Sequence, residues 1–195
     1  MKKISLVFLV AALSTTGFAQ PPKFGIKAGV NFATTNNSVS GASGNKLGLN
    51  LGVLSHIHLS PEFSLQPEVY YSGQGGTVGD VDVNLNYINI PVLVQYNFDN
   101  GFRLQTGPQL GLLTSVSSKV DGNDVDFFSS DDFKSTDVSW SFGLGYLTYS
   151  GFGIDARYNL GLTQINDAGS GKTTNRVLQL GLFYLLDHHH KARSK

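Results

Sequence analysis

Eight segments of this chain alternate apolar and polar residues, and the connections between them alternate in length. The segment at 152–162 reads FGIDARYNLGL, in which one set of alternate positions is wholly apolar. The other set carries glycine, an amide and charges of both signs. Because successive side chains of a β-strand point to opposite faces, each segment predicts a strand with one apolar and one polar face. Such a sheet must keep its apolar face away from water.

The strands are predicted at residues 23–32, 46–59, 63–73, 86–98, 102–114, 136–148 and 152–162, with an eighth after residue 174. The turns at 60–62, 99–101 and 149–151 are short, and Asp99-Asn100-Gly101 is a strong hairpin signal. The loops at 34–45, 74–85, 115–135 and 163–174 are longer. This layout predicts an eight-stranded antiparallel up-and-down transmembrane β-barrel, with short periplasmic turns and long outer loops. Closure removes both sheet edges, which lipid requires.

A targeting signal and the composition are consistent with a barrel in an outer membrane. Lys2, Lys3 and the apolar run at 4–13 are typical of a secretory signal peptide, with cleavage expected between Ala19 and Gln20. We therefore expect a signal peptide at 1–19, a barrel domain at 20–186 and a polar tail at 187–195. The chain has no cysteine, so disulfides are excluded. Its 14 basic and 14 acidic residues form no basic stripe, which disfavours nucleic acid as a partner.

Alternation alone does not say which face looks outward, since a lipocalin places its apolar face inside an eight-stranded barrel. Aromatic residues flank the short turns on the apolar face, which favours an interfacial girdle in a membrane. An aromatic core at the base of a soluble barrel is the alternative. The predicted aromatic girdle is Phe63, Phe98, Phe102, Tyr146, Phe152 and Tyr184.

Charged residues on the polar faces predict a polar network in the lumen. Its members are Lys27, Glu68, Arg103, Asp155 and Arg157, joined by His56, His58, Gln66, Gln95, Gln105 and Gln109. Buried charges must be paired, so we expect Glu68 and Asp155 to contact Arg103 or Arg157. An eight-stranded lumen is narrow enough for side chains to fill, so a structural filling is favoured over a charged channel.

Three prolines, Pro67, Pro91 and Pro108, lie inside predicted strands. Proline removes a hydrogen-bond donor from the sheet ladder. We therefore expect β-bulges or locally broken pairing at these positions.

Several segments together resemble the PorT-like outer-membrane β-barrel domain family. They are GIKAGVNF at 25–32, FSLQPE at 63–68, LNYINIPVL at 85–93, GPQLG at 107–111 and GFGIDARYNLGL at 151–162. The resemblance implies an outer-membrane barrel of Gram-negative cells and brings no catalytic motif. PorT itself is associated with a secretion system for cell-surface proteins.

Other candidate chemistry in the sequence is weak. His188, His189 and His190 are better interpreted as a solvated tail than as a metal site. The acidic loop with Asp121, Asp124, Asp126, Asp131 and Asp132 lacks the glycine and closing glutamate of a calcium loop. No P-loop or zinc spacing is present, so we expect no enzyme activity, cofactor or metal.

The functional expectation is therefore a structural or surface-interaction role. The expected partners are outer-membrane lipid and a protein at the outer loops, 115–135 above all. An accessory role in protein secretion and a soluble lipocalin-like carrier are the alternatives.

Overall fold

Long antiparallel strands make up most of the structure, a computed structural model that describes residues 21–37, 45–78, 81–120, 123–125, 134–163 and 173–186. The strands are β1 (Lys23–Asn37), β2 (Asn45–His58), β3 (Phe63–Val78), β4 (Val81–Asn97), β5 (Phe102–Val120), β6 (Asn123–Val125), β7 (Thr136–Leu147), β8 (Phe152–Gly161) and β9 (Thr173–Leu185). Over these described ranges, no helix is long and apolar enough to cross a membrane.

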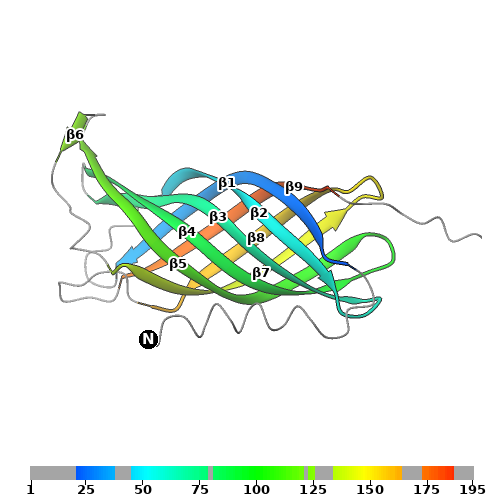
Figure 1. Cartoon of the computed structure of the whole chain (residues 1–195). Helices are drawn as coiled ribbons and strands as arrows, with labels where there is room; N and C mark the ends of the chain where they lie inside the picture. Colours follow the sequence, from blue (N-terminus) through cyan, green and yellow to red (C-terminus); the bar gives the residue numbers. More distant parts are fainter. Residues whose placement is uncertain are drawn as a thin grey trace, which may run out of the picture.

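Eight of the strands close into a barrel, as the sequence predicted (Figure 1). Each pairs antiparallel with its sequence neighbours, β5 pairs with β7, and β1 pairs with β9 to complete the ring. Among the described pairings, the short strand β6 contacts residues 118–120 of β5 alone, so it is not part of the barrel wall. In Figure 1 it projects beyond one end of the barrel.

The apolar face of the sheet points outward. Along β2, for example, the side chains of Leu47, Leu49 and Leu51 are about two-thirds exposed, whereas the intervening Asn50 is buried. The same alternation repeats along β5, β7 and β8. This orientation is that of a membrane barrel, whose apolar band faces lipid, and is the reverse of a lipocalin.

The short turns lie at one end of the barrel, together with both termini of the sheet. Gly101 and Gly151 adopt left-handed backbone conformations, with φ of 88° and 89°, which glycine tolerates best. The Gly101 amide donates to the Phe98 carbonyl at 3.0 Å, which confirms the predicted hairpin turn. At the same end the first residues of β1 pair with the last residues of β9.

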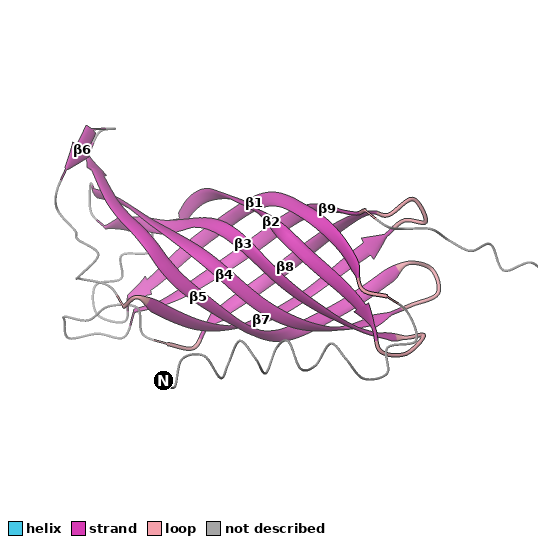
Figure 2. Ribbon diagram, viewed as in Figure 1, coloured by secondary structure: helices cyan, strands magenta, loops and turns pink. Residues whose placement is uncertain are grey.

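At the opposite end, four strands run five or six residues farther than predicted: β1, which continues to Asn37 into the predicted loop at 34–45, and β3, β4 and β5. Pairing between β3 and β4 continues without interruption from Tyr70 to Val78, so the predicted loop at 74–85 is wrong (Figure 2). β5 continues to Val120, so part of the predicted loop at 115–135 is also strand. The glycine and polar residues of 74–85 resemble a loop in composition, but backbone hydrogen bonds to a paired neighbour do not depend on apolar side chains. We call residues 73–87 and 113–120 of these strands the outer extension.

The two faces exchange character within the outer extension. In β4, Ile88, Ile90 and Val92 point outward, like the apolar side chains of the other strands in the lower part of the barrel. Above them the inward positions become apolar, and the outward positions become Asp82, Asn84 and Asn86. The inward set is a buried cluster of Val83, Leu85 and Tyr87, against which Leu113 and Val116 pack.

A β-bulge accompanies this exchange. The register of β4 and β5 shifts between Asn86 and Tyr87, which pair with Ser115 and Leu113 and leave Thr114 as the extra residue. The bulge turns both Leu113 and Val116 toward the cluster. Below it, the outward apolar stretch of β4 and its adjoining turn, from Ile88 to Phe98, has eleven residues, the length that a tilted strand needs to cross a bilayer.

The three prolines interrupt pairing without shifting register. No β2 partner is paired with Pro67, no β3 partner with Pro91, and no β4 partner with Pro108, although pairing resumes in the same register beyond each gap. The predicted broken pairing is therefore confirmed. The one register shift among the described pairings lies at the bulge beside Thr114.

Candidate functional site

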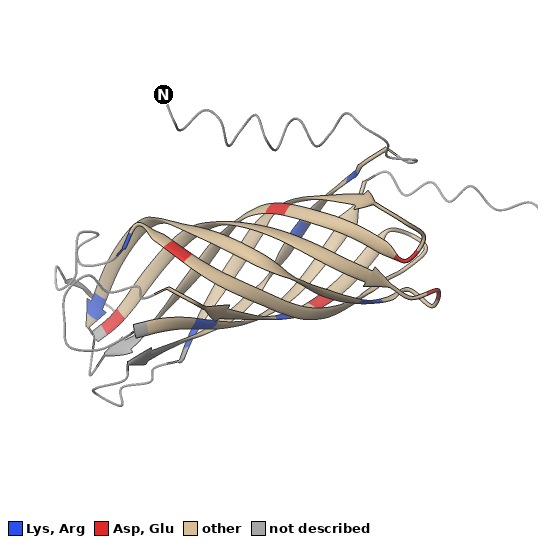
Figure 3. Ribbon diagram, turned by 90° about the horizontal axis from the view of Figure 1, so that it is seen from below, with Lys and Arg blue, Asp and Glu red and all other residues tan. Residues whose placement is uncertain are grey.

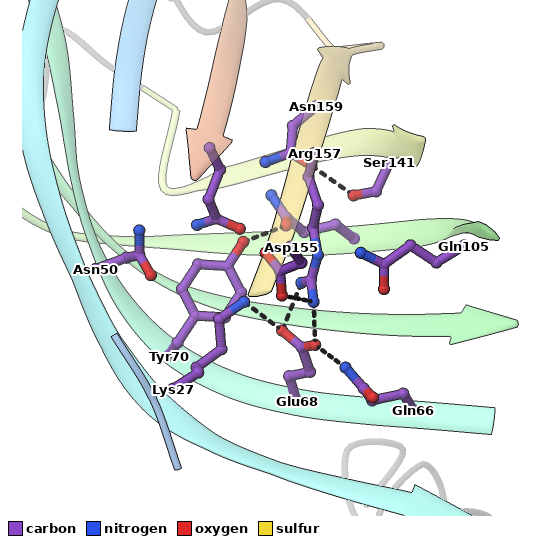
Figure 4. A network of polar contacts seen from close by, with 12 residues as sticks. Lys27, Asn50, Gln66, Glu68, Tyr70, Gln105, Ser141, Asp155, Arg157 and Asn159 are labelled. Carbon is purple, nitrogen blue, oxygen red and sulfur yellow. Dashed lines mark hydrogen bonds and ion pairs between the residues drawn. The ribbon is translucent and has the colours of Figure 1, made fainter. Parts of the chain in front are cut away.

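A carboxylate at the centre of the lumen joins three strands. Glu68 on β3 accepts hydrogen bonds from Lys27 Nζ on β1 at 2.9 Å and from both terminal nitrogens of Arg157 on β8 at 2.7 Å (Figure 4). Gln66 donates to the same carboxylate at 2.7 Å. Because β3 and β8 lie four strands apart in a ring of eight, the Glu68–Arg157 contact spans the barrel from wall to wall.

The second predicted carboxylate contacts the same arginine. Arg157 Nη2 donates to Asp155 Oδ2 at 3.0 Å, so Arg157 contacts both carboxylates. Arg103, in contrast, donates from Nη1 to the amide oxygens of Gln95 and Gln66 at 3.2 and 3.4 Å. Its guanidinium lies 4.5 Å from the centre of the Phe183 ring. The structure therefore brings the charged candidates together around Arg157, while Arg103 contacts amides and an aromatic ring.

Glycines on the inner wall make room for these long side chains. A Cβ placed at Gly143 would lie 2.9 Å from Arg157 Cγ, and one at Gly181 would lie 2.9 Å from Asp155 Oδ1. At Gly153 it would overlap the Phe183 ring. The inward glycines of β7 and β9 therefore leave the space that Arg157 and Asp155 occupy, and Gly153 of β8 leaves space for Phe183.

Uncharged polar side chains fill the lumen above the charged centre. Tyr70 donates its hydroxyl to Gln109 at 2.6 Å, and Gln109 donates to Ser139 at 3.1 Å. Higher up, Asn175 on β9 donates to Gln74 across the barrel. Further amides and a hydroxyl join the network at Asn31, Asn50, Ser72 and Gln179. Their period-two spacing is the only sequence signal that could have added them to the predicted set.

Apolar clusters bound this polar interior at both ends. The cluster of the outer extension, centred on Leu85, lies at the outer end. At the periplasmic end Leu54, Phe183 and Leu185 are at most 3% exposed and pack with Leu147. Neither cluster can be recognised from the sequence, because single apolar residues on a polar face carry no clear signal.

The remaining predicted lumen residues also point inward. His56 is 2% exposed and lies edge-on to half-buried His58, with ring centroids 4.6 Å apart. Gln95 donates to Gln105 at 2.9 Å and accepts from Ser64 at 3.2 Å. Across the part of the chain that the structure describes, no group of three or more His, Asp or Glu side chains could hold a metal ion.

The aromatic candidates lie on the outer wall near the short turns. Phe63, Phe98, Tyr146 and Phe152 are 42–62% exposed, and Phe102 and Tyr184 are partly buried. Tyr96 joins them, with ring centroids 5.2 Å from Phe63 and 4.9 Å from Phe98. The Ala19–Gln20 cleavage site, the histidines at 188–190 and the side chains of the acidic loop lie outside what the structure describes.

Solved structures with a similar fold are outer-membrane proteins. Neisserial surface protein A has a TM-score of 0.60 at 16% identity, covering 85% of this chain and 99% of its own. Ail, the attachment invasion locus protein of Yersinia pestis, has a TM-score of 0.53 at 14% identity, with the same coverage. Ail in complex with the heparin analogue sucrose octasulfate has a TM-score of 0.52 at 16% identity, again over 85% and 99%. At these identities the likeness shows the fold.

The family match agrees with this fold and with an outer-membrane location. No curated protein matches the chain. The outer membrane protein beta-barrel domain family matches residues 18–167, and nothing in the match specifically supports the narrower PorT-like label. Outward apolar strands, the closed eight-stranded ring and this match agree with one another. The chain therefore belongs to the outer membrane protein beta-barrel domain family.

Proposed function

We propose that this protein is a non-conducting, non-catalytic barrel that presents its outer extension and the loop at 115–135 to a partner at the cell surface. The lumen is filled by polar side chains and serves to hold the barrel rigid. The observation that carries the proposal is the Glu68–Arg157 contact, which joins opposite walls of the barrel at 2.7 Å.

The buried ion pairs support a closed lumen. The side chains of Glu68, Lys27 and Arg157 are at most 1% exposed. In a continuous water-filled channel these charges would be exposed to water. To open such a channel here, the ion pairs would have to separate, which would cost several kcal/mol. The described hydrogen bonds place no serine against His56 or His58, which supports a role without nucleophilic catalysis.

The height of the outer extension supports a surface role. Beyond the outward apolar stretch, residues 81–87 of β4 add roughly 20 Å of strand length at 3.3 Å per residue. Loops and strand ends carried on a rigid scaffold are the usual sites of recognition. Ail was solved with a heparin analogue, and its similar fold is consistent with contacts at this end of the barrel.

The closed lumen is tested by single-channel recording in planar bilayers. We expect the wild-type protein to give no steady conductance, because the contact between opposite walls excludes a water path. A variant with both Glu68→Ala and Arg157→Ala serves as the comparison, since it removes that contact. Steady conductance of the wild-type protein would contradict the proposal.

The surface role is tested by crosslinking on intact cells. One variant replaces residues 121–133 with a short Gly-Ser linker, and the control replaces residues 164–172 in the same way. We expect the first variant to lose crosslinks to an external partner and the control to keep them. Equal crosslinking by both variants and the wild type would remove the assignment of this loop.

A second candidate is an accessory role in protein secretion. It rests on the resemblance of segments such as LNYINIPVL at 85–93 to the PorT-like family. Deleting the gene and measuring surface delivery of secreted proteins tests it. Delivery that falls on deletion and recovers with the wild-type chain favours this role. Unchanged delivery, combined with partner crosslinks, favours the surface role alone.

A further inference from the structure

Four side chains surround two glycines on the inner wall of β7. Gly145 pairs with Arg103 on β5 and with Asp155 on β8, and Gly143 pairs with Gln105 and Arg157 in the same way. Because glycine has no side chain, the side chains of β5 and β8 lie directly over the backbone of β7: a Cβ at Gly143 would lie 2.9 Å from Arg157 Cγ and 3.0 Å from Gln105 Nε2. Neighbouring strands lie about 4.8 Å apart, so roughly 10 Å separates β5 from β8. We call these four residues the lumen square: Arg103, Gln105, Asp155 and Arg157.

The lumen square has more hydrogen-bond donors than acceptors. Four buried N–H groups have no partner among the described residues: Arg103 Nε, Arg103 Nη2, Gln105 Nε2 and Arg157 Nε. The one acceptor of the square in the same condition is Asp155 Oδ1. Arg103 and Arg157 are each 2% exposed. Buried donors without acceptors are costly, so this arrangement calls for an electron-rich group between them.

The charges of the square are also unbalanced. It holds two guanidinium groups and the carboxylate of Asp155, which is already bonded to Arg157. Glu68 is shared between Lys27 and Arg157, so the buried centre holds three positive side chains, Lys27, Arg103 and Arg157, and two carboxylates, Glu68 and Asp155. The other buried carboxylate, Asp137, lies opposite Gly111 in the strand register, near the outer end of β5. It is too far along the barrel to neutralise Arg103. One positive charge is therefore uncompensated among these buried side chains.

We propose that the lumen square binds one small monovalent inorganic anion, of the size of chloride, as the counter-ion of Arg103. The anion accepts hydrogen bonds from the buried nitrogens of the Arg103 guanidinium and from Gln105 Nε2. A single negative charge neutralises the excess. A water molecule in this place accepts only two hydrogen bonds and adds two donors to a donor-rich site.

The test uses bromide as the probe, because its anomalous X-ray scattering marks its position. The protein is purified from outer membranes and refolded in detergent with sodium bromide or sodium gluconate at equal ionic strength. We expect bromide to raise the midpoint of thermal unfolding in a saturable way. Crystals grown with bromide should show anomalous density within hydrogen-bond distance of Arg103 and Gln105.

A matched pair of variants assigns the effect to the square. Gln105→Leu and Gln109→Leu both remove an inward amide from β5, but Gln109 contacts Tyr70 and Ser139 outside the square. We expect Gln105→Leu to lower the apparent bromide affinity about tenfold, as loss of one hydrogen bond to a charged group implies. Gln109→Leu should keep the wild-type affinity.

Two outcomes would overturn the proposal: crystals of the wild-type protein without anomalous density in the square, or a bromide response equally strong in Gln105→Leu. Heat-dependent mobility in gel electrophoresis checks that each variant forms a barrel. If Gln105→Leu does not fold, the anomalous density of the wild-type crystals decides the question.

Discussion

The two parts of β4 solve opposite packing problems with the same alternating pattern. Between Ile88 and Phe98, apolar side chains point out and Asn89 and Gln95 point in. Between Val81 and Tyr87, the outward side chains are polar and Leu85 is buried inside. The lower part is built for surroundings of lipid, and the upper part for surroundings of water.

This difference shows that the surrounding medium determines which face is apolar. In lipid the outer wall gains nothing from polarity, so polar groups gather inside and bond to one another. In water the outer extension must bury its apolar residues, and the lumen mouth is the one place available. Figure 3 shows the few charged residues of the barrel wall spread along its length, with several near the ends. The chain thus changes from apolar-outward to apolar-inward packing within a single strand.

The largest expected effect comes from breaking the charged centre of the lower part. Glu68→Gln should lower the free energy of unfolding by about 3–5 kcal/mol, because Lys27 and Arg157 lose the carboxylate that both contact. Urea unfolding in detergent, followed by the fluorescence of the single tryptophan, Trp140, measures it. The control, Glu62→Gln on an exposed turn, should change it by less than about 0.5 kcal/mol. Equal effects of the two changes would refute the central role of Glu68.

The next test places the same charge on both parts of β4. Val92→Arg on the lower part should cost about 2–4 kcal/mol, because the side chain points toward the middle of the bilayer. Asn84→Arg on the outward face of the extension should cost less than about 0.5 kcal/mol, since that face meets water. Urea titrations in lipid vesicles compare them. Similar costs would mean that the lipid boundary does not lie near Ile88.

A smaller effect is expected from the apolar cluster of the outer extension. Leu85→Ala should cost about 2 kcal/mol, near the low end for such a change, because Leu113 and Val116 are only partly buried and can move inward. Amide hydrogen exchange should rise across residues 81–87 and stay slow across residues 88–98. A uniform rise along β4 would show that the two parts unfold as one unit.

The smallest effect concerns the boundary itself. The Tyr71 hydroxyl donates to Asn86 Oδ1 at 2.7 Å on the outer face. Tyr71→Phe should cost about 0.5–1 kcal/mol, because water can replace a hydrogen bond at this height. A double-mutant cycle with Asn86→Ala measures the coupling between the two side chains. Additive effects of the two substitutions would show that the contact contributes nothing.

Much of the barrel could be predicted because strand alternation and turns are local properties. The segment at 152–162 shows both faces of β8, and Asp99-Asn100-Gly101 shows the turn between β4 and β5, without reference to the rest of the chain. The region at 74–85 could not be recognised as strand, because glycine and polar residues are also typical of loops. Only the unbroken pairing of β3 with β4 reveals it as sheet.

The sequence by itself determined that charged residues share the polar faces of the strands, because a period of two assigns each residue to a face. It also determined the two-sided strands and the end at which the short turns lie. The tertiary structure decided that Lys27 and Arg157 both contact Glu68 while Arg103 contacts amides and Phe183. Contacts across the lumen depend on the stagger of the strands around the closed ring, and that stagger is set only when the last strand pairs with the first.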